Sequence, residues 1–168
     1  MNDIPSGDGG GMATLDSGGR VLSVSVKSGA QPTYDEIWSS LFSDPGGQSA
    51  VRSVVFTTAH RREGASTLSL GAALTGASLL GNARVGLLDM NVRHPRLARM
   101  CGANGEPGLT DVLAGSATAM QIAQPIGTAN CLLYPAGRPT SQSPSLLRGQ
   151  RLGEVISELI AAHDYLLV

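Results

Sequence analysis

The sequence predicts a doubly wound, mainly parallel α/β sheet with helices on both faces, and three observations carry this prediction. Compact apolar runs of strand length recur along the chain. Segments with the spacing of buried or amphipathic helices separate these runs. Strictly alternating strands and helices favour parallel strands joined by right-handed crossovers. Because the chain stops at the start of a fourth predicted strand, we expect the sheet to be incomplete at its C-terminal edge.

The predicted strands are short and rich in β-branched or leucine side chains, as expected for strands that are covered on both faces. The strongest are the runs SVVFTT and ARVGLLD, each followed by a polar loop. The third is CLLYPAG, which ends in an exit turn, and the last is DYLLV. In residue numbers the four predicted strands are 53–58, 83–89, 131–137 and 164–168.

The predicted helices differ in how clearly they are marked. One begins after Pro32, where Thr33 and Glu36 have the spacing of a capping box. A second, at 68–81, is made of small and apolar residues that suit close packing on a sheet. Two short helices are predicted at 108–115 and 118–123. The last helix shows one apolar face at helical spacing, formed by Leu152, Val155, Ile156, Leu159 and Ile160.

The first 30 residues are rich in Gly, Ser and Asp and have few large apolar side chains. Such a composition cannot bury enough surface to offset the entropy of ordering, so we expect a disordered tail at 1–30 and one domain at 31–168. The run VLSVSV at 21–26 is ambiguous, because it reads equally well as a short strand or as an apolar linker.

The bulk composition restricts the classes of function. A net charge of −1 over 168 residues gives no global field that would attract nucleic acid, so we expect no nucleic-acid partner. No stretch approaches the ~20 apolar residues that span a bilayer. Cys101 and Cys131 lack metal-ligand or redox-motif spacing, which favours buried thiols in a reducing cytoplasm.

The loop after the first strong strand has the context of a phosphate-binding P-loop, because it follows a buried strand and precedes a helix. Compared with the motif G-x-x-x-x-G-K-[ST], it gives Ala59, four residues, Gly64, Ala65 and Ser66. The second glycine and the hydroxyl are kept, whereas the first glycine and the lysine are replaced. Alone, this match is too poor to assign a site.

Four collinear segments nevertheless resemble the cytoplasmic tyrosine autokinases of bacterial capsule and exopolysaccharide synthesis, the CpsD/CapB type. TAHRREGAST stands where the family has S-x-x-P-G-E-G-K-S-T, and LLDMNVRHPRL resembles L-I-D-x-D-x-R-x-P-x-L. EPGLTDVLAG and YPAGRPTSQSPSLL resemble two further family motifs. The resemblance extends over roughly residues 30–168 and implies a P-loop NTPase fold, related to the MinD and ParA ATPases, that binds ATP or ADP with Mg²⁺.

The resemblance also implies roles for individual residues. Ser66 would hold Mg²⁺, Thr67 would lie beside the α-phosphate, and Asp89 would be the catalytic carboxylate that assists metal or hydroxyl activation. Gly64 would allow close approach of the backbone to phosphate. The whole nucleotide-binding loop implied by the resemblance is Arg61, Arg62, Glu63, Gly64, Ala65, Ser66 and Thr67.

Each of these residues also has an ordinary structural interpretation. Ser66 and Thr67 are residue types that commonly cap a helix, and Asp89 is typical of a turn at the end of a strand. Arg61 and Arg62 form either a solvated loop tip or a replacement anion clamp. Arg93, His94, Arg96 and Arg99 form either a solvated face or a docking site for an acidic tail.

The departures from the family pattern determine the predicted function. Ala65 replaces the lysine, Asn91 replaces the second aspartate, and the sequence ends before the family's second acidic motif and tyrosine-rich tail. We therefore expect a protein of exopolysaccharide assembly with weak or lost ATP turnover. We expect it to lie in the cytoplasm, at the inner face of the membrane. We expect it to regulate a membrane-bound polysaccharide co-polymerase or chain-length regulator. The sequence leaves open whether the protein also forms homo-oligomers.

Two alternatives remain open from the sequence. One is an active ATP-dependent protein-tyrosine autokinase in which Arg61 or Arg62 substitutes for the lysine. The other is a positioning ATPase of the ParA or MinD kind, which shares the fold and the strand that ends in Asp89.

Overall fold

The computed structural model describes residues 12–15, 21–24, 33–42, 51–59 and 63–168, and it confirms the predicted α/β fold. The strands in these segments form one sheet. They are β1 (Met12–Leu15), β2 (Val21–Val24), β3 (Ser53–Val55), β4 (Val85–Leu88), β5 (Gln124–Ile126), β6 (Thr128–Tyr134) and β7 (Tyr165–Leu167). The helices are α1 (Tyr34–Phe42), α2 (Ala65–Leu79), α3 (Leu97–Cys101), α4 (Leu109–Ala114), α5 (Ala119–Ile122), α6 (Ser143–Leu146) and α7 (Gln150–Ala162).

The order of the strands across the sheet is β2-β1-β3-β7-β4-β6-β5. The four central strands are parallel, since β7 pairs in parallel with β3 on one side and with β4 on the other, and β4 pairs in parallel with β6. The outer pairings, which join β1 to β2, β1 to β3 and β5 to β6, are antiparallel. The mainly parallel sheet predicted from the alternation of elements is therefore correct.

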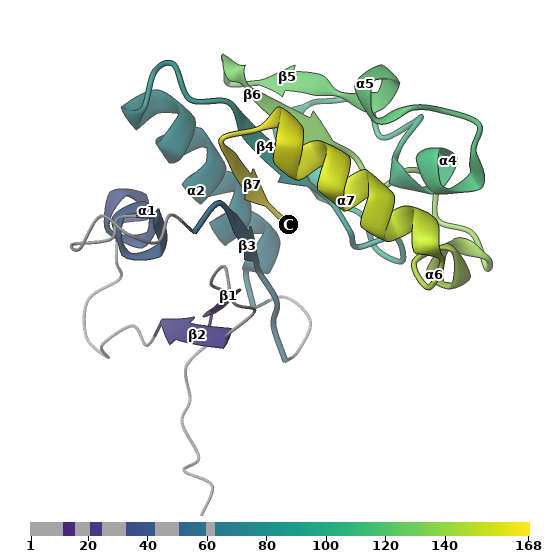
Figure 1. Cartoon of the computed structure of the whole chain (residues 1–168), viewed down its shortest axis with the longest axis horizontal. Helices are drawn as coiled ribbons and strands as arrows, with labels where there is room; N and C mark the ends of the chain where they lie inside the picture. The colour runs from purple at the N-terminus through teal and green to yellow at the C-terminus, as the bar shows by residue number, and fades with distance from the viewer. Residues whose placement is uncertain (1–11, 16–20, 25–32, 43–50, 60–62) are drawn as a thin grey trace, which may run out of the picture.

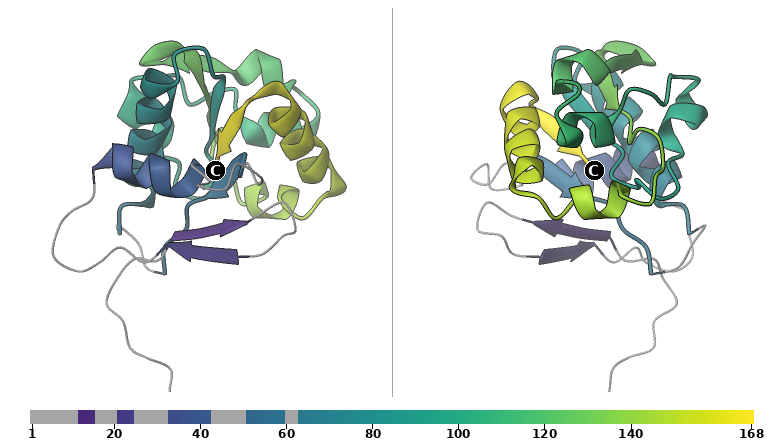
Figure 2. Two further views of the ribbon diagram at one scale, coloured as in Figure 1. Left: turned by 60° about the vertical axis from the view of Figure 1, so that its left-hand side comes forward. Right: turned by 90° about the vertical axis from the view of Figure 1, so that its right-hand side faces the viewer.

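The helices cover both faces of the sheet, with α1 and α2 on one side and α4, α6 and α7 on the other (Figures 1 and 2). Successive side chains of a strand point to opposite faces, so each central strand contributes to two cores. Leu87 packs in the core under α1 and α2, whereas its neighbour Leu88 packs in the core under α4 and α7. Leu133 and Tyr134 divide between the two cores in the same way.

Helices α1 and α2 meet through rings placed against glycines. The indole of Trp38 lies where a side chain at Gly76 would be, and the phenol of Tyr34 lies in the same way over Gly71. Trp38 is 4% exposed and its ring centroid is 4.3 Å from that of Phe42. The buried alanines of α2 lie in the same core as residues of the sheet, so the predicted close packing of this helix on the sheet is confirmed.

Other expectations can be compared element by element. The capping box of α1 is present, because the amide of Thr33 donates to Glu36 Oε2 at 2.8 Å and the amide of Glu36 donates to Thr33 Oγ1 at 3.4 Å. The two short helices expected near 108–115 and 118–123 correspond to α4 and α5. Strand β5 and helix α6 were not predicted.

The N-terminal prediction concerns residues that are only partly described. Strands β1 and β2 lie within the segment for which the composition predicted a disordered tail, and β2 agrees with the strand alternative for 21–26. The remainder of 1–30 lies outside the described residues. Within the part of the chain that is described, no helix has the length and apolar character needed to cross a membrane.

The two cysteines have different environments. Cys131 is fully buried in β6, and burial raises the pKa of its thiol to about 12, which makes it an inert apolar side chain. Cys101 at the end of α3 is partly exposed, and partial burial also raises its pKa. The buried position expected from the sequence therefore holds in full for Cys131 and in part for Cys101.

Candidate functional site: a pocket at the N-terminus of α2

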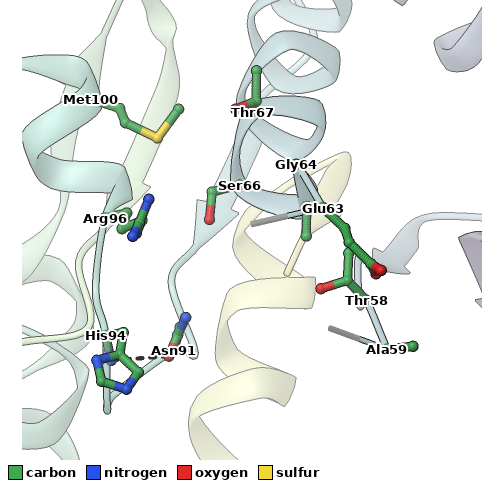
Figure 3. A pocket seen from close by; sticks show the side chains of 11 residues that line it. Thr58, Ala59, Glu63, Gly64, Ser66, Thr67, Asn91, His94, Arg96 and Met100 are labelled. Atoms are coloured by element: carbon green, nitrogen blue, oxygen red, sulfur yellow. Dashed lines mark hydrogen bonds between the residues drawn. The ribbon is translucent and has the colours of Figure 1, made fainter. Parts of the chain in front are cut away.

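A cavity of about 680 Å³ lies where β3 and β4 end, between the first turn of α2 and the loop that leads from β4 to α3 (Figure 3). This is the edge at which parallel α/β sheets bind ligands. The residues that line it are Thr58, Ala59, Glu63, Gly64, Ala65, Ser66, Thr67, Asn91, His94, Arg96 and Met100. The loop predicted to bind phosphate therefore forms one wall of a pocket, and the loop that carries the second motif forms the other.

The α2 wall presents backbone amide groups without intrahelical acceptors. The helix begins at Ala65, and the first amide to bond within it is that of Leu68, which donates to the carbonyl of Gly64 at 2.8 Å. Among the described residues, the amides of Ala65, Ser66 and Thr67 have no acceptor. Free amides and the positive end of the helix dipole together favour an anion at this place.

Gly64 makes this first turn possible. Its φ of 92° and ψ of 7° lie in the left-handed region, which a residue with a Cβ adopts only with strain. Gly64, the cap residue, makes no side-chain hydrogen bond to the first turn of the helix. The glycine kept from the motif therefore has a structural reason for being there.

Ser66 and Thr67 do not cap α2, since they occupy the second and third positions within the helix and Gly64 is the cap residue. The alternative in which they act as ordinary helix caps is therefore wrong for this structure. Both residues line the cavity, and Figure 3 shows the Ser66 hydroxyl directed toward the opposite loop. They remain candidates for contact with phosphate or with a metal ion.

The position of the motif lysine is occupied by the methyl group of Ala65, which lines the pocket without a charge or a hydrogen bond donor. Arg61 and Arg62, which the sequence suggested as replacement cations, lie outside the described residues. Glu63 lines the pocket and adds a carboxylate to the same wall.

Asp89 follows β4 directly and is 5% exposed, and it is not among the residues that line the cavity. Its Oδ1 accepts the amide of Asn91 at 3.0 Å, and its Oδ2 accepts the amides of Arg96 and Leu97, each at 3.2 Å. Desolvation raises the pKa of this carboxyl, while the three amide bonds act against that increase. Asp89 therefore joins the two ends of the loop between β4 and α3 through hydrogen bonds to its backbone.

The loop that Asp89 closes brings three polar side chains to the pocket. Asn91 Oδ1 accepts the amide of His94 at 3.1 Å, which tightens the turn, and Arg96 follows at the start of α3 (Figure 3). The sequence identified His94 and Arg96 only as part of a basic surface. The available signal was the rule that loops after neighbouring parallel strands meet at one edge.

The remaining two family-like motifs pack against each other. The amide of Leu109 donates to the carbonyl of Pro135 at 2.7 Å, and the amide of Thr110 donates to that of Ala136 at 3.0 Å. Gly108 lies against the backbone of Gly137, where a side chain would not fit. These motifs lie outside the lining of the pocket and join α4 to the end of β6.

A divalent cation would find few protein ligands here. No cluster of three or more His, Cys, Asp or Glu side chains suited to a metal occurs among the described residues. The Ser66 hydroxyl lines the pocket, whereas both oxygens of Asp89 are already engaged by amides. The donor set therefore suits Mg²⁺ that keeps several waters and arrives with the phosphates of a nucleotide, which is its usual mode of binding.

Comparison with known proteins agrees with this description. No family model matches the chain. Tyrosine-protein kinase wzc of Salmonella typhi is 33% identical over 85 residues, which are 51% of this chain and 12% of that protein, so the match spans a small part of the relative's length. The kinase domain of the Escherichia coli tyrosine kinase ETK has a TM-score of 0.65 at 15% identity, over 85% of this chain and 62% of that domain.

A second kind of P-loop protein has a related structure. The septum site-determining protein MinD of Pyrococcus horikoshii, in a structure with Mg-ADP, has a TM-score of 0.56 at 23% identity, over 69% of this chain and 47% of that one. The protein described here accordingly has the fold of the P-loop NTPases, and its sequence is similar to that of the bacterial tyrosine autokinases of the Wzc type.

Proposed function

We propose that the pocket at the N-terminus of α2 binds the phosphates of ATP or ADP together with Mg²⁺, and that turnover of the nucleotide is weak or lost. The observation that carries this proposal is a helix N-terminus with three free amides, in which a methyl group stands at the position of the motif lysine. Gly64, Ser66 and Thr67 supply the close backbone approach and the hydroxyls.

The loss of the lysine affects turnover more than binding. A charge-assisted contact to a phosphate contributes roughly 1.5–3 kcal/mol, which corresponds to about 10- to 150-fold in affinity. Catalysis of phosphoryl transfer depends almost entirely on positioning and on fixed charges that stabilise the transition state, so it depends more strongly on the lysine than ground-state binding does. Asn91 at the position of the family's second aspartate and the engaged oxygens of Asp89 act in the same direction.

The cellular role that fits such a site is regulatory. Similarity to tyrosine autokinases of polysaccharide export supports a place beside a membrane-bound co-polymerase or chain-length regulator, at the inner face of the membrane. In this role the nucleotide-bound and nucleotide-free forms of the pocket would differ in how they engage that partner, and homo-oligomerisation would add a second level of control.

The second candidate, an active tyrosine autokinase, is favoured by one observation, the presence of an arginine in the pocket. Of the three tyrosines in the chain, Tyr134 is 1% exposed and Tyr165 is partly buried, whereas Tyr34 is 39% exposed at the start of α1. Tyr34 is therefore the residue on which phosphate acquired within this chain is expected to appear first.

The decisive experiment measures binding and turnover on the same purified protein. Isothermal titration with Mg·ADP and with a non-hydrolysable Mg·ATP analogue should give measurable affinity, while incubation with Mg·ATP should release no phosphate above the background rate. The proposal would be refuted if the protein bound neither Mg·ADP nor the Mg·ATP analogue. Phosphotyrosine formed on incubation with Mg·ATP, located by mass spectrometry, would establish the autokinase instead.

A further inference from the structure

The pocket contains one arginine whose charge no described residue neutralises. Arg96 lines the cavity from the loop between β4 and α3, opposite the first turn of α2, and its side chain faces that of Ser66 (Figure 3). The guanidinium has no hydrogen bond or ion pair with any residue in the described part of the chain. Glu63, on the α2 side of the pocket, is a carboxylate with an interaction of its own.

The backbone beneath this arginine is held firmly. Its amide donates to Asp89 Oδ2 at 3.2 Å, and the next amide, that of Leu97, donates to the same oxygen. Leu97 and Ala98 are 4% and 8% exposed, which anchors the start of α3 in the core. An exposed side chain on a fixed backbone can reach into the cavity without moving the wall that carries it.

We propose that Arg96 supplies the cation for the terminal phosphates of the bound nucleotide, in place of the lysine that is missing at Ala65. This inference rests on the nucleotide-binding function proposed above. The free amides of α2 contact the phosphates from one wall, and the guanidinium contacts them from the other. A planar guanidinium donates two parallel hydrogen bonds to one phosphate group, which a lysine ammonium cannot do.

The site therefore selects ligands by their terminal phosphates. A nucleoside diphosphate or triphosphate extends far enough from the α2 amides to meet a cation on the opposite loop, whereas a monophosphate occupies the amides alone. Inorganic pyrophosphate carries the same two phosphates without a base or sugar and is a probe for the clamp itself.

The chain offers a matched control for this residue. Arg99 lies three residues further along α3, is exposed, and is absent from the lining of the cavity. Arg96→Gln removes one positive charge at the cap of α3, and Arg99→Gln removes one within α3, so any effect of net charge on the binding of an anionic ligand is common to both variants. A difference in Kd between the two variants measures the contribution of contact between Arg96 and the ligand within the pocket.

The experiment is isothermal titration of wild-type protein and of Arg96→Gln, Arg99→Gln and Arg96→Lys with Mg·ADP, AMP and magnesium pyrophosphate. Arg96→Gln should raise the Kd for Mg·ADP and for pyrophosphate by at least about tenfold while changing that for AMP by less than about threefold. Arg99→Gln should stay within about twofold of wild type, and Arg96→Lys should recover part of the loss.

The outcomes separate the inference from the function on which it rests. Equal Kd values for Arg96→Gln and Arg99→Gln, with wild type binding Mg·ADP, would overturn the role of Arg96 and leave nucleotide binding intact. Pyrophosphate binding that depends on Arg96, without any Mg·ADP binding, would retain the clamp and refute the nucleotide function. If no ligand binds wild type, both are refuted. Melting temperatures equal to that of wild type would confirm that the variants are folded.

Discussion

Replacing Asp89 with alanine should destabilise the protein, because this carboxylate closes the loop that forms one wall of the pocket. Its two oxygens accept three backbone amides, and the residue is 5% exposed. Alanine removes both accepting oxygens, and with them three hydrogen bonds, so the amides of Asn91, Arg96 and Leu97 must find water or remain unsatisfied.

The size of the effect follows from how deeply each amide is buried. The bond to the Leu97 amide is buried, and an unsatisfied buried donor costs about 1–3 kcal/mol. The bonds to Asn91 and Arg96 are partly buried, so water can replace them at about 0.5–1.5 kcal/mol each. Removing a desolvated charge, whose pKa burial has raised, offsets part of this loss. We expect a net destabilisation of about 2–4 kcal/mol.

The measurement is the free energy of unfolding from urea titrations of wild type, Asp89→Ala and Asp89→Asn. Asparagine keeps one accepting oxygen but turns an amino group toward an amide donor, so it should lie between the other two. Glu154→Gln, which changes an exposed carboxylate on α7, serves as control and should stay within about 0.5 kcal/mol of wild type.

The same experiment separates two roles of Asp89. A carboxylate that acts only in catalysis can be removed without loss of stability, since it makes no contribution to the resting fold. Asp89→Ala with an unfolding free energy within about 0.5 kcal/mol of wild type would therefore refute its assignment as the anchor of this loop.

Three further predictions concern other parts of the molecule. Ala65→Lys should lower the Kd for Mg·ADP by about tenfold or more, measured by titration calorimetry, because it restores a cation beside the α2 amides. Burial lowers the pKa of His163 below its usual 6.5, so the unfolded chain binds the proton more tightly. The melting temperature of wild type should fall as the pH drops below about 6.5, and that of His163→Gln should change less with pH over the same range. Gly76→Ala should destabilise by about 1–3 kcal/mol despite a better helix propensity, because its methyl meets the Trp38 ring, whereas Gly105→Ala, with open space around it, should be neutral in thermal melts.

The fold was predictable because its signals are local. The capping box of Thr33 and Glu36, the apolar face of α7 and the runs that became β4 and β6 each lie within a few consecutive residues. Strand β5 carries Pro125 and is three residues long, and proline is normally a signal against a strand. Its antiparallel pairing with β6 at the edge of the sheet is a tertiary fact that no local pattern contains.

The site was predictable on one wall only. Gly64 to Thr67 are consecutive, so a motif could identify them before the structure was known. Arg96 and Asn91 join them because β4 lies two places from β3 in the sheet, with β7 between them, and the loop after β4 lines the same pocket as the start of α2. The burial of Asp89 likewise depends on a loop that turns back to present the amides of residues 96 and 97. The second wall of the pocket depends on the order of the strands, and the burial of Asp89 depends on the path of a loop, so neither could be predicted from a local sequence pattern.

Under the proposed function, the position of Arg96 in the pocket bears on how nucleotide binding is separated from turnover. A lysine at position 65 would belong to the same turn as the amides, whereas Arg96 belongs to the facing loop, so the proposed phosphate would be held between two elements. Contacts that are equally strong in the ground state and in the transition state lower Kd without raising the rate. An Arg96 guanidinium that contacts the resting polyphosphate and the transition state equally would restore affinity and leave phosphoryl transfer slow, which is what the proposed regulatory role requires.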